Sequence, residues 1–304
     1  MCSLTELDLN KFNSKNIKDM SYMLYNCKSL TALNISNLVT DEVTNFSHMF
    51  YNCKKIQYLS LSKFNTRNIK DMSSMFEGCT QIFELNLQNF NTQEVTDLSN
   101  MFKGCINLYL LDLSNFKTEK VTKMGKMFQN CKNITQINLN SFNTTNVDDM
   151  SCLFQNCSIL KTVNLSKLFI TNKVKYMSAM FQNCSSLRNI DFSIIATDNA
   201  DDLPFMFQNY KALKNITIPK FRTSKVKNME YMLHYCYGIS SLELSNFDTN
   251  QVTNMRHMFD NCWDLKELNL KNFNTSNVLD MSYMFYFDNS LTSIDISNFN
   301  TEKY

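Results

Sequence analysis

The sequence repeats one unit along its whole length. Residues 75–101 read MFEGCTQIFELNLQNFNTQEVTDLSNM, and the methionine that opens the unit returns at Met101. Successive anchors differ by 26 in residue number, and the one exception is a step of 27 from Leu153 to Met180. The anchors are Met23, Met49, Met75, Met101, Met127, Leu153, Met180, Met206, Met232, Met258 and Met284. A fixed period of this length is typical of solenoids, in which each repeat packs on its neighbours. We therefore expect a single elongated domain over residues 1–304.

Each unit combines two hydrophobic spacings. Leu85 and Leu87 lie two residues apart, which suits a strand with alternate side chains inward. Val95, Leu98 and Met101 are spaced by three, which suits one face of a helix. The pattern predicts a short strand, a turn with a buried Phe, a helix of about three turns and a tight return in every coil.

Two polar columns support this prediction. A hydroxyl residue precedes each expected helix and could cap it. This column is Ser14, Thr40, Thr66, Thr92, Thr118, Thr144, Thr171, Thr197, Thr223, Thr249, Thr275 and Thr301. Residues that tolerate a left-handed conformation follow the Met-Phe pair and would end the helix. They are Asn26, Asn52, Gly78, Gly104, Asn130, Asn156, Asn183, Asn209 and Asn261.

The expected fold class is an α/β repeat, a right-handed curved solenoid. Stacked parallel strands lie about 4.8 Å apart, whereas packed helices need about 8–10 Å. This mismatch would curve the array, with the parallel sheet on the concave face and short helices on the convex face.

Composition excludes several classes of protein. The net charge of +2 gives no strong field toward nucleic acid, and no apolar stretch is long enough to span a bilayer. The N-terminal MCSLTELDLN lacks the apolar core of a signal peptide. Both ends fall in the middle of a coil without a polar cap, so we expect a segment of a longer protein or one that associates end to end.

Nine of the 11 cysteines form one column, five positions into each unit. They are Cys27, Cys53, Cys79, Cys105, Cys131, Cys157, Cys184, Cys236 and Cys262. Their regular placement indicates buried thiols that act as small hydrophobic groups. Cys2 and Cys152 lie outside the column, and Cys152 is expected to react with thiol reagents.

The sequence contains no recognisable catalytic motif and no CxxC pair. His48, His234 and His257 fall in different coils. They are not expected to converge with a carboxylate pair, so neither a metal site, nor a cofactor, nor an enzyme is predicted.

The outward positions of the strands are the candidate binding surface. Positions 10 and 12 of the unit hold 8 acids and no Lys or Arg over 24 places. The candidate residues are Glu6, Asp8, Tyr58, Glu84, Asn86, Asp112, Asn138, Asp191, Glu243, Glu267 and Asp295. The alternative is that duplication of one template copied these residues without a binding role. On the first interpretation, the polar and mildly acidic face binds a protein or glycan partner and no nucleic acid.

The array becomes irregular over residues 168–220. The extra residue lies near 169–170, Ala200 replaces a Val-type contact, and Pro204 falls where a helix is expected. We expect that helix to start late, capped by Asp202. The irregularity could be a binding feature or drift that a solenoid tolerates.

The repeated phrases LDLSNFKTEKVTKMGKMFQNC at 111–131 and LELSNFDTNQVTNMRHMFDNC at 242–262 resemble the BspA-like leucine-rich repeats. The variant is that of bacterial surface proteins and mycoplasma-type lipoproteins. This resemblance implies a leucine-rich-repeat solenoid, usually displayed on the surface, that binds partners or mediates adhesion without catalysis. The alternative is an intracellular or virion-associated assembly protein. The expected location is the cell surface if a targeting segment precedes this sequence, and otherwise the cytoplasm or a virion.

Overall fold

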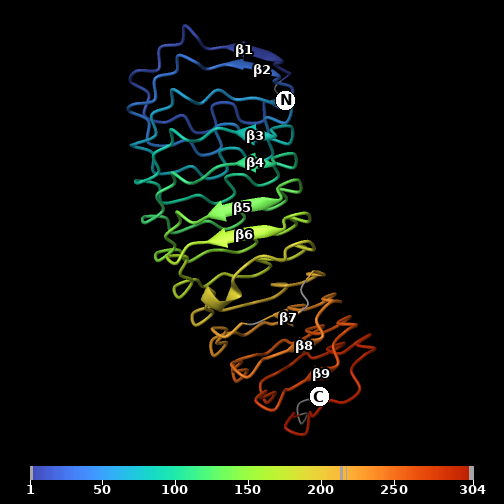
Figure 1. Ribbon diagram of the computed structural model, residues 1–304. Helices are drawn as coiled ribbons and strands as arrows, with labels where there is room; N and C mark the ends of the chain where they lie inside the picture. The colour runs from blue at the N-terminus through green and yellow to red at the C-terminus, as the bar shows by residue number, and fades with distance from the viewer. Residues whose placement is uncertain (1–2, 213–214, 217, 301–304) are drawn as a thin grey trace.

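The computed structural model describes residues 3–212, 215–216 and 218–300, so Cys2 and Thr301 lie outside the described residues. The chain winds into an elongated stack of coils that bends gently along its length (Figure 1). Neighbouring coils are joined on one side by a continuous line of parallel bridges and, in parts of the stack, on the other side by short parallel strand pairs.

The first side carries the predicted strands, each two to four residues long. They are β1 Glu6–Asp8, β2 Ala32–Asn34, β3 Glu84–Leu85, β4 Leu110–Leu111, β5 Gln136–Leu139, β6 Thr162–Leu165, β7 Asn215–Ile216, β8 Ser241–Leu242 and β9 Glu267–Leu268. Within the described residues, β1 pairs with β2, β3 with β4, β5 with β6, and β8 lies between β7 and β9. All five pairings are parallel and in register with the repeat, as for Leu85 opposite Leu111. The prediction of stacked parallel strands is confirmed.

A second line of parallel bridges runs along the other side of the coils. It joins one residue of each unit to its counterpart in the next, from Asp19 to Asp280. In chain order it links Asp19, Asn45, Asp71, Asp97, Lys123, Asp149, Tyr176, Asp202, Asn228, Asn254 and Asp280. We call the segments that follow these residues, up to the column cysteine, the turn ladder.

The predicted helices are wrong, since the described part of the chain contains no α-helix. The only helical turn there is the 3-10 helix η1, Phe192–Ile194. Where helices were expected, the turn ladder makes successive three-residue turns. In the third coil the N–H groups of Met75, Glu77 and Cys79 donate to the carbonyl three residues earlier, at 3.1–3.3 Å.

The intervening N–H groups donate to the next coil instead. Those of Met72, Ser74, Phe76 and Gly78 reach carbonyl oxygens of the following coil, at 2.7–3.1 Å. The N–H of Ser73 donates to Oδ1 of Asp71 at 2.8 Å. Every backbone donor of this segment is therefore satisfied without a helix, as burial requires.

This alternation depends on two columns of residues with positive φ. One is the Asn/Gly column, exemplified by Asn130 at φ 62° and Gly78 at φ 74°. The left-handed conformation predicted there is confirmed, although it lies within a series of turns and not at a helix end. The other column lies immediately before the anchors, as at Lys126 with φ 62° and Cys152 with φ 53°.

The Thr column caps the neighbouring coil and not a helix of its own. Thr118 Oγ1 donates to the carbonyl oxygen of Asn143 at 2.8 Å. The same oxygen accepts the N–H of Asn143 at 2.8 Å. Thr66 and Thr92 make the same pair of bonds to the coil that follows each of them. The hydroxyl column therefore joins coils, because both groups it satisfies belong to the next repeat.

The core is a set of columns that continue from coil to coil. Phe50, Phe76, Phe102 and Phe128 stack ring on ring, with centroids 5.6–5.9 Å apart. The nine column cysteines are buried, as predicted. Each thiol from Cys53 onward donates to a backbone carbonyl of the preceding coil, as Cys131 Sγ does to Phe102 at 3.2 Å. The column therefore also satisfies carbonyl groups, a role beyond that of a small hydrophobic residue.

The irregular region keeps its place in the stack. The extra residue is taken up in the turn after β6, where Ile170 N–H donates to the carbonyl of Leu168 at 2.9 Å. Asp202 does not cap a helix, because its backbone bridges Tyr176 and Asn228 in the turn ladder. Pro204 lies in the same turns, and its carbonyl accepts the N–H of Ala179 at 2.9 Å.

Curvature was predicted from the wider spacing of packed helices, and this reason does not apply because the described residues form no α-helix. Parallel backbone pairing, with its spacing of about 4.8 Å, occurs both in the line of bridges and between the paired strands on the opposite side. With no helices to widen one side, we refer to the strand face and not to a concave face. In the described residues, no helix has the length and apolar character needed to cross a membrane.

Candidate functional site

The eleven residues predicted as a binding surface are all exposed. Most lie on described strands or directly beside them, as Glu84 does in β3, and Glu267 in β9. In β5 the burial alternates strictly, with Gln136 and Asn138 exposed and Ile137 and Leu139 buried. Gln136 and Asn138 are positions 10 and 12 of their unit, so their exposure agrees with the prediction that these positions point outward. They line the strand face along the length of the stack.

Two of the acids at position 12 make hydrogen bonds that have a structural role. Asp112 Oδ1 accepts the N–H of Ser114 at 2.9 Å, and Asp295 Oδ1 accepts that of Ser297 at 3.0 Å. Such bonds to the residue two ahead form the turn that ends each strand. Hydrogen bonds from Ser114 lower the pKa of Asp112, and those from Ser297 lower the pKa of Asp295. Part of the acidic surplus therefore has a local structural cause.

An aromatic patch formed by Tyr58, Phe83, Tyr109 and Leu110 lies on the strand face. The rings of Tyr58 and Phe83 meet edge to face at 5.1 Å, and those of Phe83 and Tyr109 stack at 6.2 Å. Tyr58 is 70% exposed and Tyr109 is 55% exposed. Leu110 pairs with Glu84 across β3 and β4, which places a carboxylate beside the patch. Sequence reasoning identified only Tyr58, because Phe83 and Tyr109 occupy a position shifted by one residue.

The strand face is also hollowed in several places. One shallow hollow lies over β1 and β2 and includes Glu6 and Asp8. A second includes Asp191, and a third includes Glu267 and Asp295. Each hollow spans neighbouring coils, so a ligand seated in one would touch more than one repeat.

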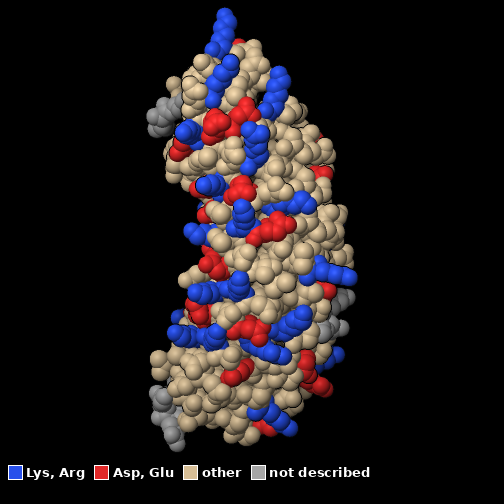
Figure 2. All heavy atoms as spheres, turned by 90° about the vertical axis from the view of Figure 1, so that its left-hand side faces the viewer, with Lys and Arg blue, Asp and Glu red and all other residues tan. Residues whose placement is uncertain are grey.

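Charges of both signs cover the face at the left-hand side of Figure 1. Figure 2 shows Lys and Arg interspersed with Asp and Glu there, with no continuous stripe of one sign. Across neighbouring coils Lys120 Nζ lies 2.6 Å from Glu94, and Lys123 Nζ lies 3.8 Å from Asp97. A surface that follows a nucleic-acid backbone needs a basic stripe, which this face lacks.

A different column of side chains leads along the turn ladder to a second site. Position 3 of the unit holds a row of glutamines, from Gln129 to Gln208, whose amide Nε2 groups each donate to Oε1 of the next. At the end of the row, Gln208 Nε2 lies 2.8 Å from Nδ1 of His234. The next residue of the column is Asp260.

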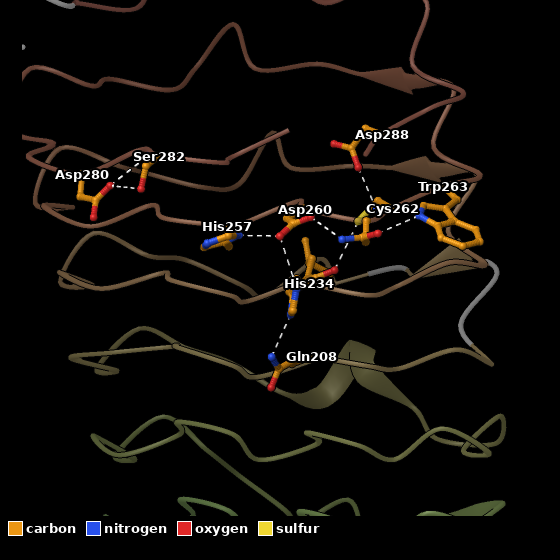
Figure 3. Close-up of polar contacts among 11 residues, drawn as sticks. Gln208, His234, His257, Asp260, Cys262, Trp263, Asp280, Ser282 and Asp288 are labelled. Carbon is orange, nitrogen blue, oxygen red and sulfur yellow. Dashed lines mark hydrogen bonds and ion pairs between the residues drawn. The ribbon is translucent and has the colours of Figure 1, made fainter. Parts of the chain in front are cut away.

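His234 and His257 converge on Asp260, as Figure 3 shows. Oδ2 of Asp260 lies 3.4 Å from Nε2 of His234 and 2.5 Å from Nδ1 of His257. No convergence of histidines with a pair of carboxylates was expected, and these two histidines meet instead on a single carboxylate. His234 lies one whole unit before Asp260 in the same column, and His257 lies three residues before Asp260 in the same turn. A search by repeat position would have found the pair, whereas a search for motifs did not.

This His–Asp cluster is largely buried and has little permanent positive charge. Asp260 is only 2% exposed, and within the described residues its ion-pair partners are the two histidines, with no Lys or Arg. Burial lowers the pKa of His234, although Asp260 opposes this shift. Nearby, burial raises the pKa of Asp288 to about 7.

The third histidine provides an internal comparison. His48 occupies the same column as His257 and stacks on Tyr22 at 4.5 Å. The residue three positions onward is Tyr51, so no carboxylate stands in the place of Asp260. His48 Nδ1 is buried without a hydrogen-bond partner.

Comparison with known proteins gives one match over the whole length. The family described as "Mycoplasma protein of unknown function, DUF285" matches residues 1–108, 79–190, 162–242 and 237–304. No curated protein matches the chain.

Several solved structures resemble the chain at low identity. A leucine-rich cell surface protein from Faecalibacterium prausnitzii A2-165 is 13% identical, with a TM-score of 0.47, and the match covers 91% of this chain and 77% of that one. A leucine-rich repeat protein from Eubacterium ventriosum ATCC 27560 is 15% identical, with a TM-score of 0.43 and coverage of 96% and 78%. One from Bacteroides ovatus ATCC 8483 is 15% identical, with a TM-score of 0.35 and coverage of 98% and 83%. Likenesses at this level do not bear on function.

Proposed function

Because this chain belongs to the family described as Mycoplasma protein of unknown function, DUF285, we propose a function from its own surface. The chain is a non-enzymatic binding scaffold whose strand face recognises a protein partner. The observation that carries this proposal is the aromatic patch of Tyr58, Phe83, Tyr109 and Leu110. Display on a cell surface, with a role in adhesion, is part of the proposal and rests on the resemblance to BspA-like proteins.

The patch has the chemistry of an interface centre. Exposed Tyr side chains offer a large apolar area with a polar end, and residues of this kind dominate the binding energy of interfaces. The three rings contact one another across successive coils, so little conformational entropy is lost when a partner binds. Tyr58 and Tyr109 would be the anchors because they are the most exposed members.

The acids around the patch favour a partner with a basic surface. Glu84 lies on the strand beside Leu110, and Asp112 directly follows β4. The lowered pKa of Asp112 keeps this carboxylate charged even in mildly acidic conditions. A protein partner is favoured over a glycan because the patch combines aliphatic Leu110 with aromatic rings across more than one coil.

The test begins with capture of partners from the surface fraction of the source organism, followed by titration of each purified partner. Tyr58→Ala combined with Tyr109→Ala should weaken binding by at least about tenfold. The matched control is Tyr176→Ala combined with Leu279→Ala. These residues are 55% and 70% exposed and lie on or beside the line of bridges, at Tyr176 and next to Asp280, away from the strand face.

A second arm tests charge without disturbing the turns. Glu84→Gln, Asp112→Asn and Asp191→Asn together retain hydrogen-bond acceptors and remove three charges, so they should reduce the salt dependence of binding. The control reverses Lys123 and Lys126. Loss of binding in either control, with the strand-face variants unaffected, would place the working surface on the turn ladder and refute the proposal.

A further inference from the structure

We propose that His234, His257 and Asp260 form a binding site for one divalent transition-metal ion of the zinc type. The site is independent of the strand face and of any partner there. It joins two neighbouring coils, because His234 lies in the turn-ladder segment that follows Asn228, whereas His257 and Asp260 lie in the next segment, which follows Asn254.

The ligand atoms are close to the arrangement that zinc requires. His234 Nε2, His257 Nδ1 and Asp260 Oδ2 all lie within 4.8 Å of one another. Bonds of about 2.0–2.1 Å in a tetrahedral site put ligand atoms about 3.3 Å apart. The two distances to Asp260, 3.4 Å and 2.5 Å, bracket that value. Small rotations of the side chains would therefore admit an ion, with water as the fourth ligand.

The surroundings hold each ligand in place, as outer partners do in metal sites. The ring of His257 lies between Tyr231 at 4.5 Å and Tyr283 at 4.8 Å, and both contacts are stacked. Oδ1 of Asp260 accepts from Nδ2 of Asn261 at 2.5 Å, which leaves Oδ2 for the ion.

The ring of His234 is held by a hydrogen bond between its Nδ1 and the side-chain amide of Gln208. A metal ion on Nε2 requires the proton of His234 to sit on Nδ1. The Gln208 amide would then turn so that Oε1 accepts this proton, which reverses the direction of the hydrogen bonds in the glutamine row.

The charge of the site also favours a cation. A carboxylate as buried as Asp260 is costly unless a positive charge compensates it. The neutral imidazole is the form of histidine that binds metals. A divalent ion therefore compensates Asp260 without requiring the histidines to be protonated.

The proposal is tested by titrating the intact chain with Zn²⁺ in a calorimeter. One equivalent should bind and raise the melting temperature. His234→Gln, His257→Phe and Asp260→Asn should each weaken Zn²⁺ binding by at least about tenfold and abolish the rise in melting temperature. These variants should fold, since Gln stands at position 3 in four other coils and Phe205 stands in the column of His257.

Two controls separate this site from other binding. His48→Gln removes a histidine of the same column that lacks the carboxylate, and it should leave the affinity unchanged. Co²⁺ should give the visible bands of a four-coordinate site with nitrogen and oxygen ligands. A sulfur-to-cobalt charge-transfer band would instead assign the ion to cysteine. The proposal would be overturned by that charge-transfer band or by an equal loss of Zn²⁺ affinity in His48→Gln. It would also be overturned if the folded wild-type chain did not bind Zn²⁺.

Discussion

At the scale of single residues, the threonine hydroxyls decide how one coil recognises the next. Most of these buried hydroxyls both donate to and accept from the backbone of one residue in the following coil, as Thr118 does with Asn143. A hydroxyl column could be predicted from the sequence. Its partner could not, because a capping residue before a helix and a bridging residue between coils look the same in one repeat.

Thr118→Val should therefore be much more costly than its small change in shape suggests. The substitution keeps the volume but leaves the N–H and carbonyl of Asn143 without their partner. The expected loss is about 2–4 kcal/mol of unfolding free energy, measured by chemical denaturation. Thr122→Val is the control, because the exposed Thr122 hydroxyl makes only a 3.3 Å bond to Thr96. Equal effects of the two substitutions would contradict the bridging role.

Thiol labelling tests the burial of the cysteine column. Burial raises the pKa of Cys157 to about 12, and its thiol donates to the carbonyl of Phe128 at 3.1 Å. Cys152 is half-buried and its pKa is raised mainly by burial, so it should react slowly but before the column. Mass spectrometry after labelling without denaturant should find Cys152 modified and Cys157 intact. Rapid modification of the column thiols would show that the coils open more readily than this packing implies.

Asp288 should make stability depend on pH. Its Oδ1 accepts the N–H of Cys262 at 2.8 Å, while Oδ2 is buried without a partner. Burial raises its pKa from 3.8 to about 7, so the folded state binds a proton that the unfolded state releases. The contribution of this group to stability is present at low pH and is lost as pH rises toward about 7.

Asp288→Asn should remove this pH dependence and raise stability at about pH 8 relative to the native residue. Denaturation at about pH 5 and about pH 8, with a chelator present, measures the difference. A pH dependence identical in the two proteins would show that Asp288 is not the group responsible.

At the scale of elements, the strands were predictable and the helices were not. Alternation at Leu85 and Leu87 identifies a strand because both are buried on one side. Spacings of three, as at Val95, Leu98 and Met101, fit a helix, but they also fit successive three-residue turns. Only the backbone conformation distinguishes a helix from successive turns, through positive φ at residues such as Lys126. The column of Lys126, immediately before the anchors, shows no preference for Asn or Gly that would have indicated this in the sequence.

Lys126 offers a direct test of this correction. In a left-handed conformation Gly avoids the steric cost of a side chain, so Lys126→Gly should stabilise the fold by about 0.5–1 kcal/mol. Lys126→Ala should give no such gain, because Ala has the same steric cost there. In a helix the order would reverse, with Gly about 1 kcal/mol worse than Ala. Denaturation of both variants decides the sign, and far-UV circular dichroism should lack the α-helical double minimum.

At the scale of the whole molecule, the 26-residue period was enough to predict most of the architecture. It predicted an elongated stack in which each column continues into the next coil, and the resemblance to the BspA-like repeats of mycoplasma type is confirmed by the family match over residues 1–304. The strand-face residues followed from their columns. The His–Asp cluster was missed, because its two columns meet in other coils too, as at Ser74 and Glu77, and combine histidine with aspartate only at His257 and Asp260.

The stack should tolerate the removal of one whole unit. Deletion of residues 102–127 removes one complete unit and places Phe128 after Met101, which preserves every column. We expect a folded protein with a single cooperative transition at a slightly lower temperature. Deletion of residues 103–127 instead leaves one extra residue in the turn ladder and reverses the alternation there. Equal melting temperatures for the two deletions would refute the importance of register.

The two lines of backbone pairing also determine how the protein carries mechanical load. Their hydrogen bonds run from coil to coil, along the long axis of the stack. A force that pulls the two ends apart loads them in tension, so they break a few at a time and not all together in shear. The chain should then extend in small steps, each releasing one coil, or about 90 Å of extended chain. A protein built this way yields at low force and shortens again when the force falls, as a spring between two attachment points does.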